Sequence, residues 1–160
     1  MHLKERAFCQ GEFLLEKFAD GQAVRENRPY IRIVIFNIFV TVGLVEVWSL
    51  ITAQGGTAYS AANANLAVGD SAAAPAVGQV ALQGANQARA PMNPGFPNAP
   101  VGGVEVWQAD FGPLVANFDW NEFAVFNAPI GGTMMDRAVS AQGVKIAGQT
   151  WRLTFTFTLS

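Results

Sequence analysis

The C-terminal segment Thr150–Leu159 alternates between apolar and polar side chains along its length. Threonine fills all the polar positions except Arg152, and the apolar ones are Trp151, Leu153, Phe155, Phe157 and Leu159. A repeat of two residues belongs to a β-strand with one hydrophobic and one hydrophilic face. The pattern therefore predicts a long strand with a hydroxyl-bearing side. Such a strand indicates a β-sheet fold, to which other segments of the chain contribute further strands.

Further strand candidates occur along the chain, separated by short segments that contain glycine pairs. Tyr30–Phe39 is dense in β-branched and aromatic residues and is predicted to be a buried strand. The other candidates are Asn63–Val68, Val104–Phe111, Asp119–Phe126 and Thr133–Ser140. Short strands linked by glycine-rich turns are typical of an all-β fold, here an antiparallel β-sandwich or a jelly-roll-like barrel.

Two segments interrupt this pattern. Leu44, Val47, Trp48 and Ile51 recur at steps of three and four residues, and Gln54-Gly55-Gly56 follows, which predicts one short helix over residues 41–53. Residues 71–100 contain five prolines, so most of 91–100 is expected to be loop or sheet edge. This loop is either exposed or grips a neighbouring subunit.

Charge is concentrated at the N-terminus. Residues 1–32 carry six Lys or Arg and five Asp or Glu, whereas residues 33–104 carry only Glu46, Asp70 and Arg89. We therefore divide the chain into a charged N-terminal arm or hairpin, 1–32, and a β domain, 33–160. Asp20-Gly21 between Glu12–Phe18 and Gln22–Arg28 is a hairpin signal. A partner-binding extended arm and an exposed hairpin on the same domain are both compatible with these observations.

The overall balance of charge and hydrophobicity narrows the possible partners. A net charge of −2 offers no surplus of cations to neutralise a phosphate backbone, so no nucleic acid is expected. The uncharged apolar run Ile33–Val45 is interrupted by Asn37 and is shorter than the roughly 20 residues of a spanning helix, so no membrane span is expected. With 51% hydrophobic residues, part of the surface is expected to be covered by neighbouring subunits.

The chain offers little for catalysis. It has one histidine, His2, and one cysteine, Cys9, and contains no phosphate-binding loop, nucleophile elbow or zinc-protease motif. We expect no enzyme, no catalytic residues, no cofactor and no metal. Two carboxylate pairs are conceivable, Glu105 with Asp110 and Asp119 with Glu122. The members of each pair differ in strand parity, which favours surface or turn positions.

Two other groups of side chains are ambiguous. Asp136 and Arg137 could each join an ion pair, which contributes about 0–1 kcal/mol if it is exposed. Trp107, Trp120 and Trp151 either pack in the core or between subunits, or form a platform on which a sugar stacks.

Asp119–Arg137 has the sequence DWNEFAVFNAPIGGTMMDR. It resembles a recurrent motif of small structural proteins of tailed bacteriophages, in which an acidic residue and aromatic residues precede a VFNA..GGTM..R turn. The matching positions are Glu122, Val125, Phe126, Asn127, Ala128, Gly131, Gly132, Thr133, Met134 and Arg137.

The resemblance extends over about residues 40–160 and leaves the charged N-terminal segment unmatched. Val40–Leu50 is similar to the helix of that family, and residues 66–75 are similar to its LAVG segment. Residues 150–154 resemble the closing strand, although Arg152 stands where a threonine is usual.

This resemblance implies a non-enzymatic virion protein. A charged arm followed by an uncharged body suits a capsid cement or decoration protein that stabilises the major capsid lattice. On that basis the expected partner is the major capsid protein, the expected state a homotrimer, and the expected location the capsid surface after assembly in the host cytoplasm. A tail or tail-fibre-associated protein is the second interpretation, although heptads and collagen-like repeats are absent. A monomeric carbohydrate-binding module is the third.

Overall fold

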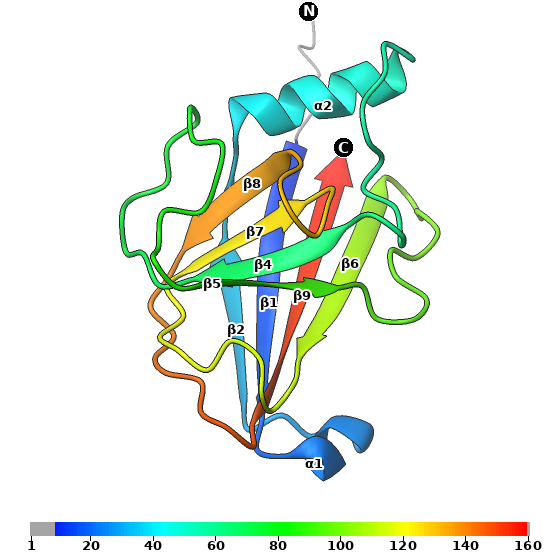
Figure 1. The fold of residues 1–160 in the computed structure, drawn as a ribbon. Coiled ribbons are helices and arrows are strands. Elements are labelled where there is room, and N and C mark those ends of the chain that lie inside the picture. Colours follow the sequence, from blue (N-terminus) through cyan, green and yellow to red (C-terminus); the bar gives the residue numbers. More distant parts are fainter. Residues whose placement is uncertain (1–8, 160) are drawn as a thin grey trace, which may run out of the picture.

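The computed structural model describes residues 9–159, which form a sandwich of two antiparallel sheets (Figure 1). One sheet, which we term sheet A, has the strand order β2-β1-β9-β6, and the other, sheet B, has the order β3-β8-β7-β4-β5. The strands are β1 (Cys9–Phe18), β2 (Ile31–Phe36), β3 (Ile38–Phe39), β4 (Asn65–Gly69), β5 (Gln87–Pro91), β6 (Val104–Phe111), β7 (Glu122–Phe126), β8 (Met134–Val139) and β9 (Thr150–Leu159). The predicted all-β sandwich is confirmed.

The alternating C-terminal segment is an interior strand of sheet A. All ten residues of β9 pair with β1, from Cys9 opposite Leu159 to Phe18 opposite Thr150. On the other side β9 pairs with the whole of β6. Its apolar residues Trp151, Leu153 and Phe155 are buried between the sheets, as the period of two requires.

The N-terminal segment was expected to be either an extended arm or an exposed hairpin, and its described part supplies strand β1, which pairs antiparallel with β2. Residues 9–18 form β1, which lies between β2 and β9, so this part of the charged segment belongs to the sandwich. The predicted second hairpin strand, Gln22–Arg28, is wrong, because a short helix α1 (Gly21–Arg25) starts there. The Asp20 side chain accepts the Ala23 N–H at 2.8 Å and caps this helix. Residues 1–8 of the expected arm lie outside the described residues.

The segment Tyr30–Phe39 is not the single buried strand that its composition predicts. It forms β2 and β3, with a break at Asn37 where the chain passes from sheet A to sheet B. Within β2 only Ile35 is buried, because β2 is the edge strand of its sheet and one of its sides has no second layer over it. Composition indicated the strand correctly but could not indicate its place in the sheet.

The remaining elements agree closely with the predictions. The predicted helix is α2 (Thr41–Ile51), which lies across one end of the sandwich (Figure 1). Each of the four strand candidates beyond residue 60 contains a strand, and β6 has the predicted bounds. The short β5 was missed because its residues, which include two alanines and a proline, do not favour strands.

The core is aromatic and lies between the two sheets. Trp120 contacts both Trp151 and Phe111 edge to face, with ring centroids 4.8 Å apart in each pair. Trp107 is 5% exposed, Trp120 0% and Trp151 2%. These three rings therefore pack in the core. Across residues 9–159, no helix is both long and apolar enough to span a bilayer.

Candidate interaction site

The carboxylates that the sequence singled out do not come together as acid–base pairs. Glu105 and Asp110 lie on opposite faces of β6, since Glu105 lines a pocket beside Trp107 whereas Asp110 pairs on the outer face with Arg152, Oδ1 to Nε 2.7 Å. Asp119 accepts a hydrogen bond from the Asn121 side chain. Among the described residues, no three His, Cys, Asp or Glu side chains are grouped closely enough to hold a metal ion.

Glu122 and Arg137, the first and last matching positions of the motif, form an ion pair inside the protein. Arg137 Nε donates to Glu122 Oε2 at 2.9 Å, and both side chains have no exposed surface. The register of β7 and β8 places Arg137 opposite Ala124, one diagonal step from Glu122. The surface or turn position expected for Glu122 is therefore wrong, whereas Arg137 does join an ion pair, and a buried one.

The same ion pair holds the alanine-rich loop 70–86 over the outer face of sheet B. The Glu122 carboxylate accepts the N–H groups of Gln83, at 2.9 Å, and Gly84, at 2.7 Å. Arg137 Nη1 donates to the Ala73 carbonyl and to Gln79 Oε1, each at 3.0 Å. Because the loop covers this face, β4 and β7 are buried along their whole lengths.

Asn127, in the turn between β7 and β8, holds helix α2 in place by hydrogen bonds. Asn127 Oδ1 accepts the Thr133 N–H, and its Nδ2 donates to the Thr57 carbonyl and to Glu46 Oε1 of the helix, both at 2.9 Å. Gly132 has a φ of +69°, and a Cβ there would lie 2.7 Å from Asn127 Oδ1. A glycine is therefore required for the turn to close around the asparagine.

Asp136 of β8 is a second buried acid, and its hydrogen-bond partners are neutral groups, so it does not form the ion pair that the sequence allowed. Its side chain is fully buried, accepts the Val125 N–H at 3.0 Å and accepts a hydrogen bond from Asn37, where the chain passes between the sheets. Burial raises the pKa of Asp136 to about 8, against the hydrogen bonds from Asn37 and Val125, which lower it.

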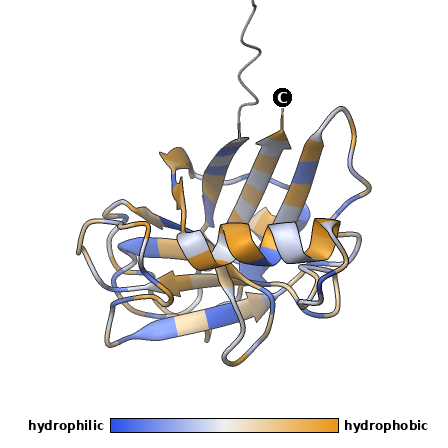
Figure 2. Cartoon of the chain, turned by 90° about the horizontal axis from the view of Figure 1, so that it is seen from above, coloured by the Kyte–Doolittle hydropathy of each residue, from blue (hydrophilic) through white to orange (hydrophobic). Residues whose placement is uncertain are grey.

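Helix α2 carries apolar side chains on two opposite sides, and only one of these sides faces the core. Val47 and Leu50 pack against the core, and Gly43 lies so close to the Met135 backbone that a Cβ there would be 2.2 Å from its carbonyl oxygen. The opposite side faces solvent (Figure 2) and carries Leu44 at 39% exposed, Val45 at 59%, and Trp48 and Ile51 at 64% each. We call these four residues the α2 face.

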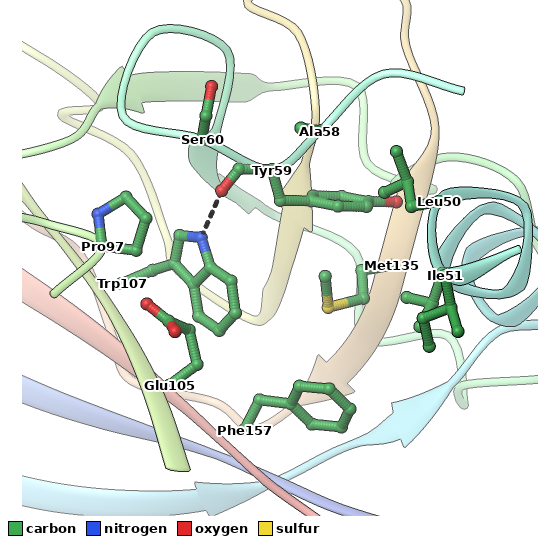
Figure 3. A pocket seen from close by; sticks show the side chains of 11 residues that line it. Leu50, Ile51, Ala58, Tyr59, Ser60, Pro97, Glu105, Trp107, Met135 and Phe157 are labelled. Atoms are coloured by element: carbon green, nitrogen blue, oxygen red, sulfur yellow. Dashed lines mark hydrogen bonds between the residues drawn. The ribbon is translucent and has the colours of Figure 1, made fainter. Parts of the chain in front are cut away.

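A pocket of about 390 Å³ opens beside the helix (Figure 3). Its walls are almost entirely apolar, and they come from α2, from the segment 58–60 and from strands of both sheets. The residues that line it are Val47, Leu50, Ile51, Ala58, Tyr59, Ser60, Pro97, Glu105, Trp107, Met135 and Phe157.

Two hydrogen bonds hold the aromatic walls of this pocket in place. Trp107 Nε1 donates to the Tyr59 carbonyl at 2.8 Å (Figure 3). The Tyr59 hydroxyl donates to the Thr133 carbonyl at 3.2 Å. Burial raises the pKa of Glu105, the single carboxylate of the lining. The pocket and the α2 face form one apolar surface at this end of the molecule, suited to receive apolar side chains of another protein.

Sequence reasoning found only part of this surface. It recognised the helical spacing of Leu44, Trp48 and Ile51, but a helix with a single charged residue, Glu46, does not reveal which of its apolar sides faces the core. The pocket residues Tyr59, Met135 and Phe157 come from three distant segments and carry no common local signal. Comparisons with protein-family models, with curated proteins and with solved structures found no match to this chain.

Proposed function

We propose that the chain is a non-enzymatic structural protein of a tailed-phage virion, and specifically a cement protein that attaches to the major capsid lattice through the α2 face. The observation that carries this proposal is the exposed apolar helix: Trp48 and Ile51 lie 64% exposed at one end of the sandwich. Monomeric proteins rarely leave a contiguous apolar patch uncovered unless it binds something. The resemblance of residues 119–137 to a phage motif supplies the class of partner.

The internal construction of the sandwich supports an attachment role. The buried Glu122–Arg137 pair and the Asn127 turn hold the loop 70–86 and helix α2 at fixed positions. A rigidly mounted helix loses little conformational entropy when it docks, so its apolar side chains contribute most of their burial energy to binding.

The size of the effect can be estimated from Trp48. A tryptophan buries about 150–250 Å², and at about 25 cal/mol per Å² its exposed part contributes roughly 2–4 kcal/mol when a partner covers it. Truncating it should therefore weaken attachment by about 30- to 1000-fold.

Co-sedimentation with purified empty capsids tests the proposal. We expect the chain to pellet with shells, and a Trp48→Ser, Ile51→Ser variant to bind at least about 30-fold more weakly. The matched control is Leu114→Ser with Ile130→Ser, two residues that are 85% and 90% exposed in loops and should leave attachment unchanged.

Each alternative gives a distinct result. Binding to purified tails but not to shells would favour a tail-associated protein, and binding of the isolated monomer to a glycan array would favour a carbohydrate-binding module. If the unmodified chain does not bind shells, or if both double variants bind as well as it does, the cement assignment is wrong.

A further inference from the structure

Strand β2 forms an edge of sheet A that no other described segment covers. It stands at the end of the strand order, and no other backbone segment among residues 9–159 pairs with its outer side. Its sequence, Ile31–Phe36 (IRIVIF), holds five apolar residues and a single charge. On the outer face of the sheet Val34 is 52% exposed and Phe36 69% exposed.

The opposite edge of the same sheet is covered. The Asn93 and Asn98 N–H groups donate to carbonyls of β6, and their side chains accept the N–H groups of Asp110 and Val106. The loop 93–98 therefore satisfies the outward-facing backbone groups of β6. Sheet B ends in the two-residue β3 and in the short β5, which finishes at Pro91. Edges that are short, covered or closed by proline resist pairing with another chain.

Strand β2 is neither covered by a loop of residues 9–159 nor closed by a proline. It contains no proline, no glycine and no bulge. Its one cation does not repel a partner, because Arg32 Nε donates to Glu16 Oε1 of the neighbouring strand at 2.7 Å. A flat apolar strand with unpaired N–H and C=O groups is a template for strand addition.

We propose that β2 pairs antiparallel with the β2 of a second copy of this chain, joining two copies of sheet A into one continuous sheet. A second copy fits this edge because the sequence complements itself. When Val34 lies opposite Val34 of the partner subunit, Arg32 lies opposite Phe36 of the partner subunit, and the reciprocal pair forms on the other side. A guanidinium beside an exposed aromatic ring is a favourable contact.

The register follows from parity. Residues directly opposite each other in an antiparallel pair point to the same face of the sheet. The hydrophobic cores of the two copies therefore lie on the same face of the joined sheet only when the two-fold axis passes between two copies of the same residue. An axis at Arg32 would bring two guanidinium groups together, which is unfavourable. Parity also allows an axis at Ile33 or Ile35, but only the axis at Val34 sets Arg32 opposite Phe36 of the partner subunit, and it places the exposed valines in contact.

This inference is independent of the capsid assignment, because β2 and the α2 face are separate surfaces. A two-fold contact of this kind does not close a trimer. A homotrimer would therefore require a further interface elsewhere on the chain.

Disulfide trapping tests the register directly. In a Cys9→Ser background, Val34→Cys should form an interchain disulfide on mild oxidation, because opposed residues of antiparallel strands have Cα atoms about 4.5–5.5 Å apart. The matched control is Val106→Cys, a valine on the covered edge strand of the same sheet, which should stay reduced. Equal cross-linking of the two variants would overturn the proposal.

Sedimentation equilibrium gives a second, independent measurement. We expect the unmodified chain to form dimers, and Val34→Lys to weaken dimerisation at least about 100-fold, because it places two ammonium groups opposite each other. Circular dichroism should show both proteins folded, since the Val34 side chain is half exposed. A monomeric unmodified chain at about 100 μM, or a dimer or trimer that Val34→Lys leaves intact, contradicts the pairing.

Discussion

Replacing Glu122 by glutamine removes one charge from the buried ion pair while keeping the shape of the side chain. In the native protein Glu122 Oε2 accepts Arg137 Nε at 2.9 Å, and neither side chain reaches solvent. The substitution leaves the guanidinium without a counter-charge, which costs about 3–5 kcal/mol at buried positions. The amide oxygen can still accept the Gln83 and Gly84 N–H groups, although more weakly than a carboxylate does.

We therefore expect the free energy of unfolding to fall by about 3–5 kcal/mol. At about 2–4 °C per kcal/mol for a domain of this size, Tm should fall by roughly 6–20 °C. Urea unfolding followed by the fluorescence of the buried tryptophans measures the change. The control is Glu26→Gln, which removes one partner of the exposed Glu26–Arg28 pair and should leave the urea midpoint almost unchanged.

A double variant distinguishes the buried charge from general damage to packing. In Glu122→Gln with Arg137→Met no unpaired charge remains, so the double variant should lose less stability than the sum of the two single variants. A loss below about 1 kcal/mol for Glu122→Gln, or simple additivity in the double variant, would refute the reasoning.

Three further predictions concern other parts of the sandwich. Burial raises the pKa of Asp136 to about 8, so the folded state holds a proton that the unfolded state releases near pH 4, and stability should fall as pH rises from about 4 to 8. Asp136→Asn should flatten that slope in urea unfolding measured at several pH values. Gly132→Ala should destabilise the chain by about 1–3 kcal/mol or more, because it combines a positive φ with a Cβ 2.7 Å from Asn127 Oδ1. Gly131→Ala shares the positive φ but meets no atom within 4 Å, so thermal melting should show a smaller loss, and equal losses would count against the contact. Deleting residues 1–28 should unfold the chain, because it removes a strand from the middle of sheet A; a native near-ultraviolet circular dichroism spectrum of the truncated protein would disprove this.

The sequence predicted the elements whose signal is local. The alternation in β9 and the helical spacing in α2 depend on side chains within a few residues of one another, and both segments formed as expected. The place of β1 was not predictable in this way, because Glu16 and Lys17 are typical of a solvated segment. In the fold Glu16 pairs with Arg32, and Lys17 lies 4.1 Å from the centroid of the Trp151 ring and donates to the Gln142 carbonyl. Contacts between distant segments therefore allow charged residues to occupy an interior strand.

The motif at residues 119–137 also depends on contacts between separate strands, which the local sequence does not predict. Its residues could be recognised from the sequence, but the pairing of Glu122 with Arg137 depends on the register of β7 and β8, which contains an irregularity between Val125 and Phe126. The parity argument made on a single strand placed Glu122 at the surface or in a turn. The interaction surface was still harder to predict, because exposure of one side of an apolar helix is a property of the packed molecule.

The two proposals together have a geometric consequence. Helix α2 lies across one end of the sandwich, and an antiparallel β2 pair turns the second copy through 180° about an axis perpendicular to sheet A (Figure 1). The two α2 faces then point to opposite ends of the dimer, so one dimer cannot place both on the same shell. Dimers locked by Val34→Cys should therefore bridge separate empty capsids into clusters detectable by light scattering, whereas the Val34→Lys monomer should coat single shells. If locked dimers bind shells without clustering them, the β2 axis or the assignment of α2 as the attachment surface is wrong.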